Sequence, residues 1–263
     1  MFYKLKHNLD GSYMINNDFG RLRYNRIGAF SNEEVDSIFD FAYRMTFGGE
    51  GEHRGRRTGG TANRTNGQKF ANTFQGKLGE LAVNKELSRL GLNPSQPDYT
   101  VGGLGFWDHF DMIVNNRQVS IKSIKYFSQL LLLETGDWDE SGRYLHGMNA
   151  NRNIIPVQYD FVFLSRINPS SEDTLSHHHL LYSDRVNRND LSDIILSNEW
   201  GYDIPGFITC DELIYVIQHR HIIPAHSMFS PNGRRYTEIE AENYYVRAAD
   251  MHSLNEITAL LPA

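Results

Sequence analysis

The chain has 263 residues, of which 40% are hydrophobic and 12% aromatic, and a formal net charge of −6. This length and hydrophobic content are enough for a buried core, and we expect one domain over residues 1–263. The negative charge argues against a protein that coats nucleic acid nonspecifically, because Lys and Arg drive such binding by neutralising phosphates. It does not argue against an acidic metal site with basic residues concentrated on another face.

The cysteine content and the hydropathy indicate in which cellular compartment the protein resides. A single cysteine, Cys210, excludes an internal disulfide and fits a reducing environment. The N-terminal residues contain no apolar stretch typical of a signal peptide, and the most apolar run, SQLLLLE, is too short to span a bilayer. We therefore expect a soluble cytoplasmic protein.

The first half of the chain predicts two helices separated by a loop. Residues 1–30 alternate polar and aromatic positions, which is typical of strands or an irregular arm. Ser31 and Glu34 form a capping box, and apolar residues at helical spacing then predict a helix to about Phe47. A second helix is predicted from about Asn72 to Leu90.

The predicted loop between these helices, Gly48–Phe70, is rich in Gly, Asn and Thr and has no apolar periodicity. Its basic residues are Arg54, Arg56, Arg57, Arg64 and Lys69. Such residues on a flexible backbone suit phosphate contacts and hydrogen bonds to base edges. The alternative interpretation is a solvated linker in which these residues have no specific role.

The second predicted helix contains two glycines and one acidic residue of interest. Gly76 and Gly79 each cost about 1 kcal/mol relative to Ala in a helix, so a close approach to a sheet or to DNA would explain them. Glu80 lies at the edge of the apolar stripe, where it is either a functional acid or a solvated helix residue.

A β-hairpin is predicted around residues 110–125. Residues 110–114 and 118–125 alternate as strands do, and Asn115-Asn116 can form a two-residue turn with positive φ. A tight turn pairs Val114 with Arg117 and sets Asp111 opposite Ser120. Because side chains alternate along a strand, Lys122 then lies on the same face as Ser120. The side chains predicted to face a core are Ile113, Val119, Ile121 and Ile124.

The rest of the chain completes an α/β pattern. Residues 126–134 form a strand or a short helix, residues 135–153 a polar excursion, and residues 158–165 a buried strand beside the hairpin. Further helices are predicted after caps at Asp190, Thr209 and Ser253. A turn at Pro231–Gly233 is predicted to lead to a strand near Tyr244–Arg247.

The hairpin and the preceding helix resemble the PD-(D/E)xK nuclease superfamily, to which most type II restriction endonucleases belong. Asp111 matches the Asp of that motif, Ser120-Ile121-Lys122 matches its acid-x-Lys tripeptide, and Glu80 matches an acid often found on the preceding helix. Ser120 departs from the usual acid. Some restriction enzymes with Ser-x-Lys take the missing carboxylate from a downstream Glu, which corresponds here to Glu134.

The resemblance covers roughly residues 70–165 and implies a mixed central sheet flanked by helices, of the restriction-endonuclease-like kind, with residues 166–263 as a C-terminal α/β extension. It implies Mg²⁺, which prefers oxygen ligands. The expected ligands are Asp111, the Ile121 carbonyl and either Glu80 or Glu134. Lys122 would position the attacking water and stabilise charge at phosphorus, and Ser120 could hold a water.

The implied function is sequence-specific cleavage of double-stranded DNA by a homodimer, with a cognate DNA methyltransferase acting on the same site. Candidate sequence readers are the Arg54–Lys69 loop and the turn with Arg234 and Arg235. A structure-specific repair or recombination nuclease and a DNA-binding module with a decayed active site are the alternatives. The 11 histidines, including His177-His178-His179, raise a zinc site as a rival, although consecutive residues lack a known ligand spacing.

Overall fold

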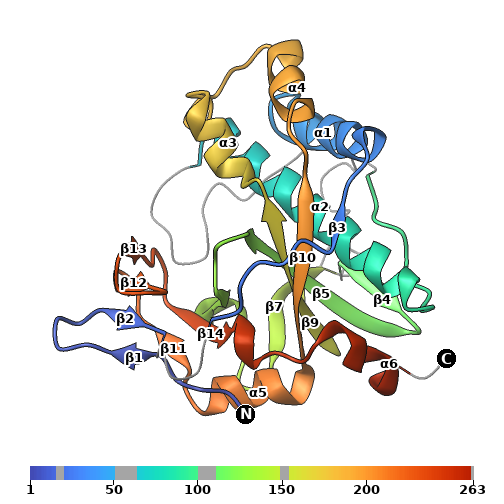
Figure 1. Cartoon of the computed structure of the whole chain (residues 1–263). Coiled ribbons are helices and arrows are strands. Elements are labelled where there is room, and N and C mark those ends of the chain that lie inside the picture. Colours follow the sequence, from blue (N-terminus) through green and yellow to red (C-terminus); the bar gives the residue numbers. More distant parts are fainter. Residues whose placement is uncertain (16–20, 51–63, 100–110, 149–153, 262–263) are drawn as a thin grey trace.

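The computed structural model describes residues 1–15, 21–50, 64–99, 111–148 and 154–261, and shows a mixed α/β protein (Figure 1). Its α-helices are α1 (Asn32–Thr46), α2 (Asn66–Arg89), α3 (Ser171–His177), α4 (Arg188–Leu196), α5 (Cys210–Gln218) and α6 (Ile257–Leu260). None of these helices is long and apolar enough to cross a membrane. Short 3₁₀ helices are η2 (Thr135–Asp137), η3 (Ala248–Asp250) and η4 (Leu254–Glu256).

A five-stranded sheet forms the centre of the molecule. In order across the sheet, the strands are β3 (Gly28–Ala29), β10 (Gly201–Thr209), β9 (Phe161–Asn168), β5 (Arg117–Lys125) and β4 (Met112–Val114). The sheet is mixed, because β5 and β9 run parallel and the other neighbours are antiparallel. The strand predicted beside the hairpin is therefore confirmed as β9, and β10 brings residues from the C-terminal part of the chain into the same sheet.

Three smaller sheets surround this centre. The first contains β1 (Lys6–His7), β2 (Tyr13–Met14), β12 (Met228–Ser230) and β13 (Thr237–Glu238). The second contains β11 (Ile222–Ile223), β14 (Asn243–Arg247) and β6 (Leu130–Glu134). The third pairs β7 (Arg143–Met148) with β8 (Ile154–Gln158). The predicted strand near 244–247 is β14. The ambiguous run is strand β6, whose leucines are buried on both sides, so no periodicity distinguished strand from helix.

The central sheet buries both faces. On one, here called the α2 face, Val119, Ile121 and Phe163 share a core with helices α1, α2 and α4. On the other, the α5 face, Val162 and Leu164 pack with α5, β6 and β14. Figure 1 shows α4 at the top, α1 beside it, α2 running diagonally across the middle to the right, and α5 at the bottom. The two cores place alternate residues of β5 in different environments.

Helix starts follow their capping residues. α1 begins as predicted, with a complete Ser31–Glu34 capping box. The predicted start of the second helix was wrong: α2 begins at Asn66, because Thr65 and Gln68 form a capping box there. The cap of α4 is Asn187, whose side chain accepts from the N–H groups of residues 189 and 190, so the prediction of Asp190 as the cap was also wrong.

Gly79 lets α2 approach the sheet closely. A Cβ added at Gly79 would lie 2.5 Å from Ser165 Oγ on β9 and 2.8 Å from Ser123 Cβ on β5. A Cβ at Gly76 would meet nothing within 4 Å. The predicted close approach to a sheet is therefore confirmed at Gly79, whereas nothing in the described residues requires Gly76.

A buried ion pair ties the N-terminal segment to the sheet. Arg166 of β9 is fully buried, and its Nε donates to Asp203 Oδ1 of β10 at 2.8 Å. Its other nitrogens donate to the main-chain carbonyls of Leu22, at 2.8 Å, and Arg23, at 3.0 Å. A buried charge is tolerated when paired and hydrogen-bonded in this way.

Candidate functional site

The site is built on the Asp111 hairpin, which we define as residues 111–125. Val114 pairs with Arg117 and Met112 with Val119, which is the predicted register. Asn115 and Asn116 have φ values of 47° and 62°, as a two-residue hairpin turn requires. This short local turn fixes which residues of the two strands oppose each other.

The register also corrects the predicted core face. Met112 and Val114 are buried on the α2 face, and Ile113 is only half-buried. Ile113 pairs with Gln118, so both lie on the α5 face, because opposed residues share a face. Ile124 also packs on the α5 face, two residues beyond Lys122. Of the four predicted core residues, only Val119 and Ile121 share the α2 core.

Asp111 is anchored to the strand that carries Ser120 and Lys122. Its Oδ2 accepts the Ile121 main-chain N–H at 2.6 Å and the hydroxyl of the buried Ser120 at 3.1 Å. This confirms that Asp111 lies opposite Ser120. Both bonds fall on Oδ2. Oδ2 thus orients the carboxylate, and no described residue donates a hydrogen bond to its other oxygen.

The main chain of Ile121 adds a second oxygen at the same edge. The Lys122 carbonyl accepts from Ser165 Oγ of β9 at 3.4 Å, so it points toward β9. In an extended strand, successive carbonyls point to opposite sides and the N–H and C=O of one residue to the same side. The Ile121 carbonyl therefore points, like its N–H, to the β4 edge where Asp111 lies. A carboxylate and a carbonyl at a strand edge provide oxygen ligands that suit a hard cation such as Mg²⁺.

Lys122 lies on the α5 face beside a cluster of aromatic rings. Its Nζ is 6.0 Å from the ring centre of Tyr144 on β7. The Tyr144 ring lies 5.5 Å from that of Trp138 and 6.2 Å from that of Tyr159. Burial raises the pKa of Tyr159, and the charge of Asp111 raises it further. Tyr159 therefore feels the charge of Asp111 and contacts the ring that lies under Lys122.

The two candidate acids occupy different places. Glu80 is on α2, which packs on the α2 face, and its Oε2 is 2.7 Å from Lys77 Nζ. Glu134 ends β6 opposite Asn243 of β14. Strand alternation puts Glu134 on the side of Leu132, away from Leu133, which faces the α5 core. Neither position decides between them, so the second carboxylate stays a prediction.

The sequence analysis did not single out Asp137, an acid beside β7. His146 Nε2 on β7 lies 3.0 Å from Asp137 Oδ1 of η2, and the His146 ring is 5.8 Å from that of Tyr144. β7 falls in the segment interpreted as a polar excursion, where only the alternation of Tyr144 and His146 hinted at a strand. Among the described residues, no group of three or more His, Cys, Asp or Glu could hold a metal ion.

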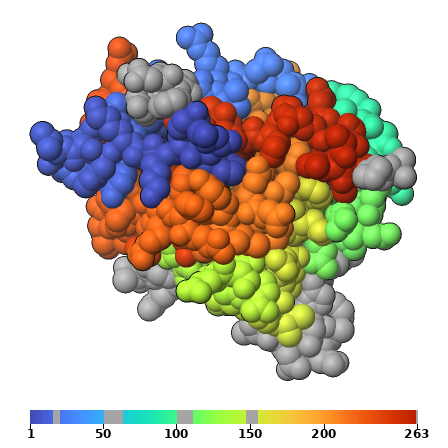
Figure 2. Space-filling view, turned by 90° about the horizontal axis from the view of Figure 1, so that it is seen from below, coloured from blue at the N-terminus to red at the C-terminus, as the bar shows by residue number. Residues whose placement is uncertain are grey.

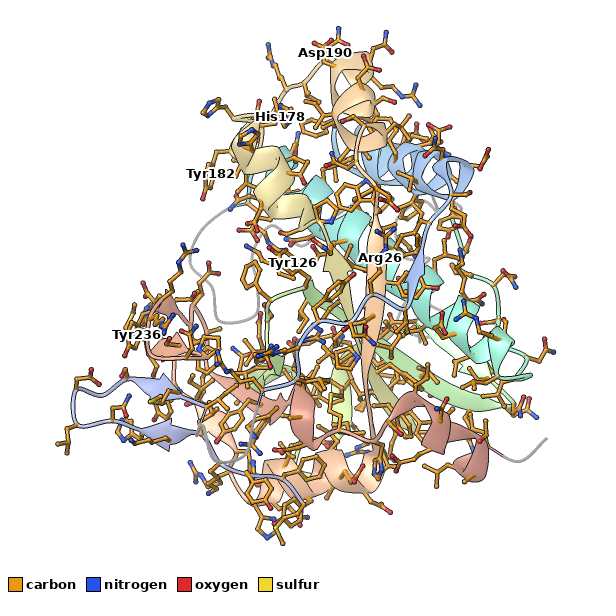
Figure 3. All side chains as sticks on the ribbon, in the orientation of Figure 1. Arg26, Tyr126, His178, Tyr182, Asp190 and Tyr236 are labelled. Carbon is orange, nitrogen blue, oxygen red and sulfur yellow. The ribbon has the colours of Figure 1, made fainter. Side chains whose placement is uncertain are left out.

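The predicted DNA-contact residues are only partly placed. Arg54, Arg56 and Arg57 lie outside the described residues. Arg64 precedes the Thr65 cap, and Lys69 is helical, which corrects its assignment to the loop. The turn at Pro231–Gly233 is confirmed: Asn232 Oδ1 accepts the N–H of Arg234 at 3.0 Å. Arg234 and Arg235 are exposed there, next to Tyr236, which Figure 3 shows on a projecting part of the molecule.

The histidines that the structure describes belong to no group of three or more residues that could hold a metal ion. His177 ends α3 and His178 is its C-cap, and Figure 3 shows His178 at the periphery of the molecule. His226 pairs with Glu238 at 2.7 Å on another sheet. His221 is buried, and burial lowers its pKa to about 4. The described residues therefore offer no zinc site.

Known proteins give no independent indication of function. Comparison of the chain with protein-family models, with curated proteins and with solved structures found no match. The geometry of the Asp111 hairpin is therefore the basis for assigning its chemistry.

Proposed function

We propose that this protein is a site-specific, Mg²⁺-dependent endonuclease that hydrolyses phosphodiester bonds of double-stranded DNA, with a restriction-endonuclease-like core. The observation that carries the proposal is the bonding of Asp111 to the strand of the Ser-x-Lys tripeptide. It brings the Asp111 carboxylate to the edge of β5, the strand that carries the Ile121 carbonyl and Lys122. This combination matches what metal-assisted phosphodiester hydrolysis requires.

Each residue has a distinct part in this chemistry. Mg²⁺, when bound, neutralises charge on the scissile phosphate and makes water a better nucleophile. Asp111 Oδ1 and the Ile121 carbonyl would hold it, with Glu80 or Glu134 supplying a further oxygen. Ser120 is neutral and already donates to Asp111, so it fixes the carboxylate and adds no charge. Lys122 orients the water and stabilises negative charge at phosphorus.

Cleavage of both strands at a specific sequence would use a two-fold homodimer on a palindromic site. The exposed turn with Arg234 and Arg235 supports a role in DNA contact, because Arg recognises guanine through O6 and N7. An enzyme of this kind would have a cognate methyltransferase for the same sequence.

Plasmid digestion with Mg²⁺ tests the proposal. The native protein should give discrete bands, and Lys122→Ala should give none. Lys125→Ala is the matched control: Lys125 lies on the same strand but faces away from Lys122 and pairs with Glu172 at 3.2 Å. A smear or junction cutting would favour a repair nuclease, and DNA binding without cleavage would favour a decayed binding module. Absence of both binding and cleavage would refute the proposal.

The second acid can be assigned with the same assay. Glu80→Gln and Glu134→Gln keep the side-chain shape and remove one charge each. We expect the variant that loses the metal-binding acid to require a higher Mg²⁺ concentration for half-maximal cleavage, whereas the other should match the native protein. Asp137→Asn extends the series to the acid near His146.

A further inference from the structure

Four lysines of the described chain hold their ammonium group over an aromatic ring. The distances from Nζ to the ring centre lie between 5.4 and 6.0 Å. The pairs are Lys77 over Phe41, Lys85 over Phe30, Lys122 over Tyr144 and Lys125 over Phe127. These four contacts can be compared directly, because they join the same kind of cation to a similar ring.

Lys122 differs from the other three in its charged neighbours. Lys77 pairs with a carboxylate at 2.7 Å, Lys85 at 2.8 Å and Lys125 at 3.2 Å. Lys122 forms no ion pair with any carboxylate of the described residues. Within the part of the chain that the structure describes, no carboxylate therefore neutralises the positive charge of Lys122. Its ammonium group instead lies over the ring face of Tyr144.

We propose that Tyr144 is a positioning residue that holds the Lys122 amine toward the scissile phosphate; this inference rests on the proposed nuclease function. The face of an aromatic ring attracts a cation through its quadrupole but adds no net charge. A carboxylate beside Lys122 would fix the amine equally well, but it would compete with the phosphate for it. Tyr144 fixes the amine and leaves its charge to the substrate.

Tyr144 is itself held by neighbouring rings and by strand pairing. Its ring packs against those of Trp138 and Tyr159, which are both buried, and its main chain pairs with Val157 of β8 and with Trp138. Figure 2 shows the β7 and β8 segments, lime and yellow, at the surface next to the orange segment that contains α5. A side chain held by packing against neighbouring rings is what precise positioning of a partner group requires.

A series of ring substitutions at position 144 tests the charge interaction. Tyr144→Phe keeps the ring face, so its cleavage rate should stay within about twofold of the native rate. Pentafluorophenylalanine at the same position is close in shape but reverses the sign of charge on the ring face, and should lower kcat by about tenfold with a smaller change in KM. Equal rates for phenylalanine and pentafluorophenylalanine would overturn the proposal, whatever happens to the larger truncation Tyr144→Leu.

Phe127→Leu is the matched control. It removes the ring under Lys125, which keeps its ion pairs with Glu172 and Asp173, and should leave cleavage unchanged. Loss of activity in this variant to the same degree as in the position-144 series would show a general effect of removing rings, and would count against a specific role of Tyr144.

A readout without DNA separates this inference from the proposed function. Lysines carrying ¹³C-methyl groups give NMR signals that shift upfield over an aromatic face, and Lys122→Arg identifies the signal of Lys122. An upfield signal in the native protein that returns to the usual position in Tyr144→Leu supports the contact even if no cleavage is found. A Lys122 signal at the usual position in the native protein overturns the contact, whether or not the protein cleaves DNA.

Discussion

Replacing Gly79 by Ala should destabilise the protein although it improves helix propensity. Ala gains about 1 kcal/mol over Gly inside a helix. A Cβ at Gly79, however, would lie 2.5 Å from Ser165 Oγ and 2.8 Å from Ser123 Cβ. The Ser123 Cβ is fixed by the strand backbone, so it cannot rotate away. Overpacking of this kind costs about 1–3 kcal/mol, so the net free energy of unfolding should fall by about 1 kcal/mol.

Gly76 provides the control within the same helix. A Cβ there meets nothing within 4 Å, so Gly76→Ala should raise the free energy of unfolding by about 0.5–1 kcal/mol. Urea denaturation of the two single variants should therefore give shifts of opposite sign. The double variant Gly79→Ala with Ser123→Gly removes the closest carbon contact and should recover part of the loss.

Stabilisation by Gly79→Ala as large as that by Gly76→Ala would show that α2 does not approach the sheet as closely as described. Because Ser123 follows Lys122 on β5, we also expect Gly79→Ala to lower cleavage if the nuclease proposal is right. Unchanged cleavage in a clearly destabilised variant would mean that the strand tolerates the displacement.

Three other predictions concern the site and the charges around it. Asp111→Asn should reduce Mg²⁺-dependent cleavage at least about a hundredfold while DNA binding measured by fluorescence anisotropy persists, because a ligand is lost but the phosphate contacts remain; near-native cleavage would remove Asp111 from the site. Asp203→Ala leaves Arg166 buried without its carboxylate, so urea denaturation should show a loss of about 3–5 kcal/mol, which a variant replacing both by apolar residues should largely recover. The hydrogen bond to Glu256 raises the pKa of His252, so its stabilisation is full below the usual value of about 6.5 and disappears as the pH rises through the raised pKa. The difference in Tm between the native protein and His252→Gln should therefore be larger at about pH 5.5 than at about pH 9, and a pH-independent difference would contradict this.

The hairpin could be predicted because its signals are local. Alternation over a few residues and the Asn115-Asn116 turn determine the register, and the register alone sets Asp111 opposite Ser120. The capping boxes of α1 and α5 were readable for the same reason. In each case, the residues that decide the structure are neighbours in the chain.

The start of α2 was missed although the Thr65–Gln68 capping box that marks it is local, and strand β10 was missed because pairing with distant residues decides it. Gly67 near the start of α2 reads as a loop residue, yet a Cβ there would lie 2.1 Å from the Leu180 carbonyl oxygen, so the close packing requires glycine. β10 contains Pro205 and Gly206, which argue against a central strand. The pairing with β9 shifts register between Asp203 and Gly206, and this irregularity accommodates them.

The aromatic surroundings of Lys122 could not be derived from sequence for a similar reason. Tyr144 reaches Lys122 only because β7 pairs with β8 and both lie over the α5 face. Spacing along the chain says nothing of such a contact. Sequence motifs identify the groups that perform chemistry more readily than those that orient them.

The strand order of the central sheet has a consequence for biosynthesis. β3, near the N-terminus, has β10 as its partner, and Arg166 must be available before the segment around Leu22 and Arg23 can dock. The segment from Leu22 to Ala29 therefore leaves the ribosome long before Arg166 and β10, its partners, exist, while the Asp111 hairpin can close on itself at once. Vectorial synthesis should thus form the hairpin early and seat the segment from Leu22 to Ala29 only after residues 201–209 have been made.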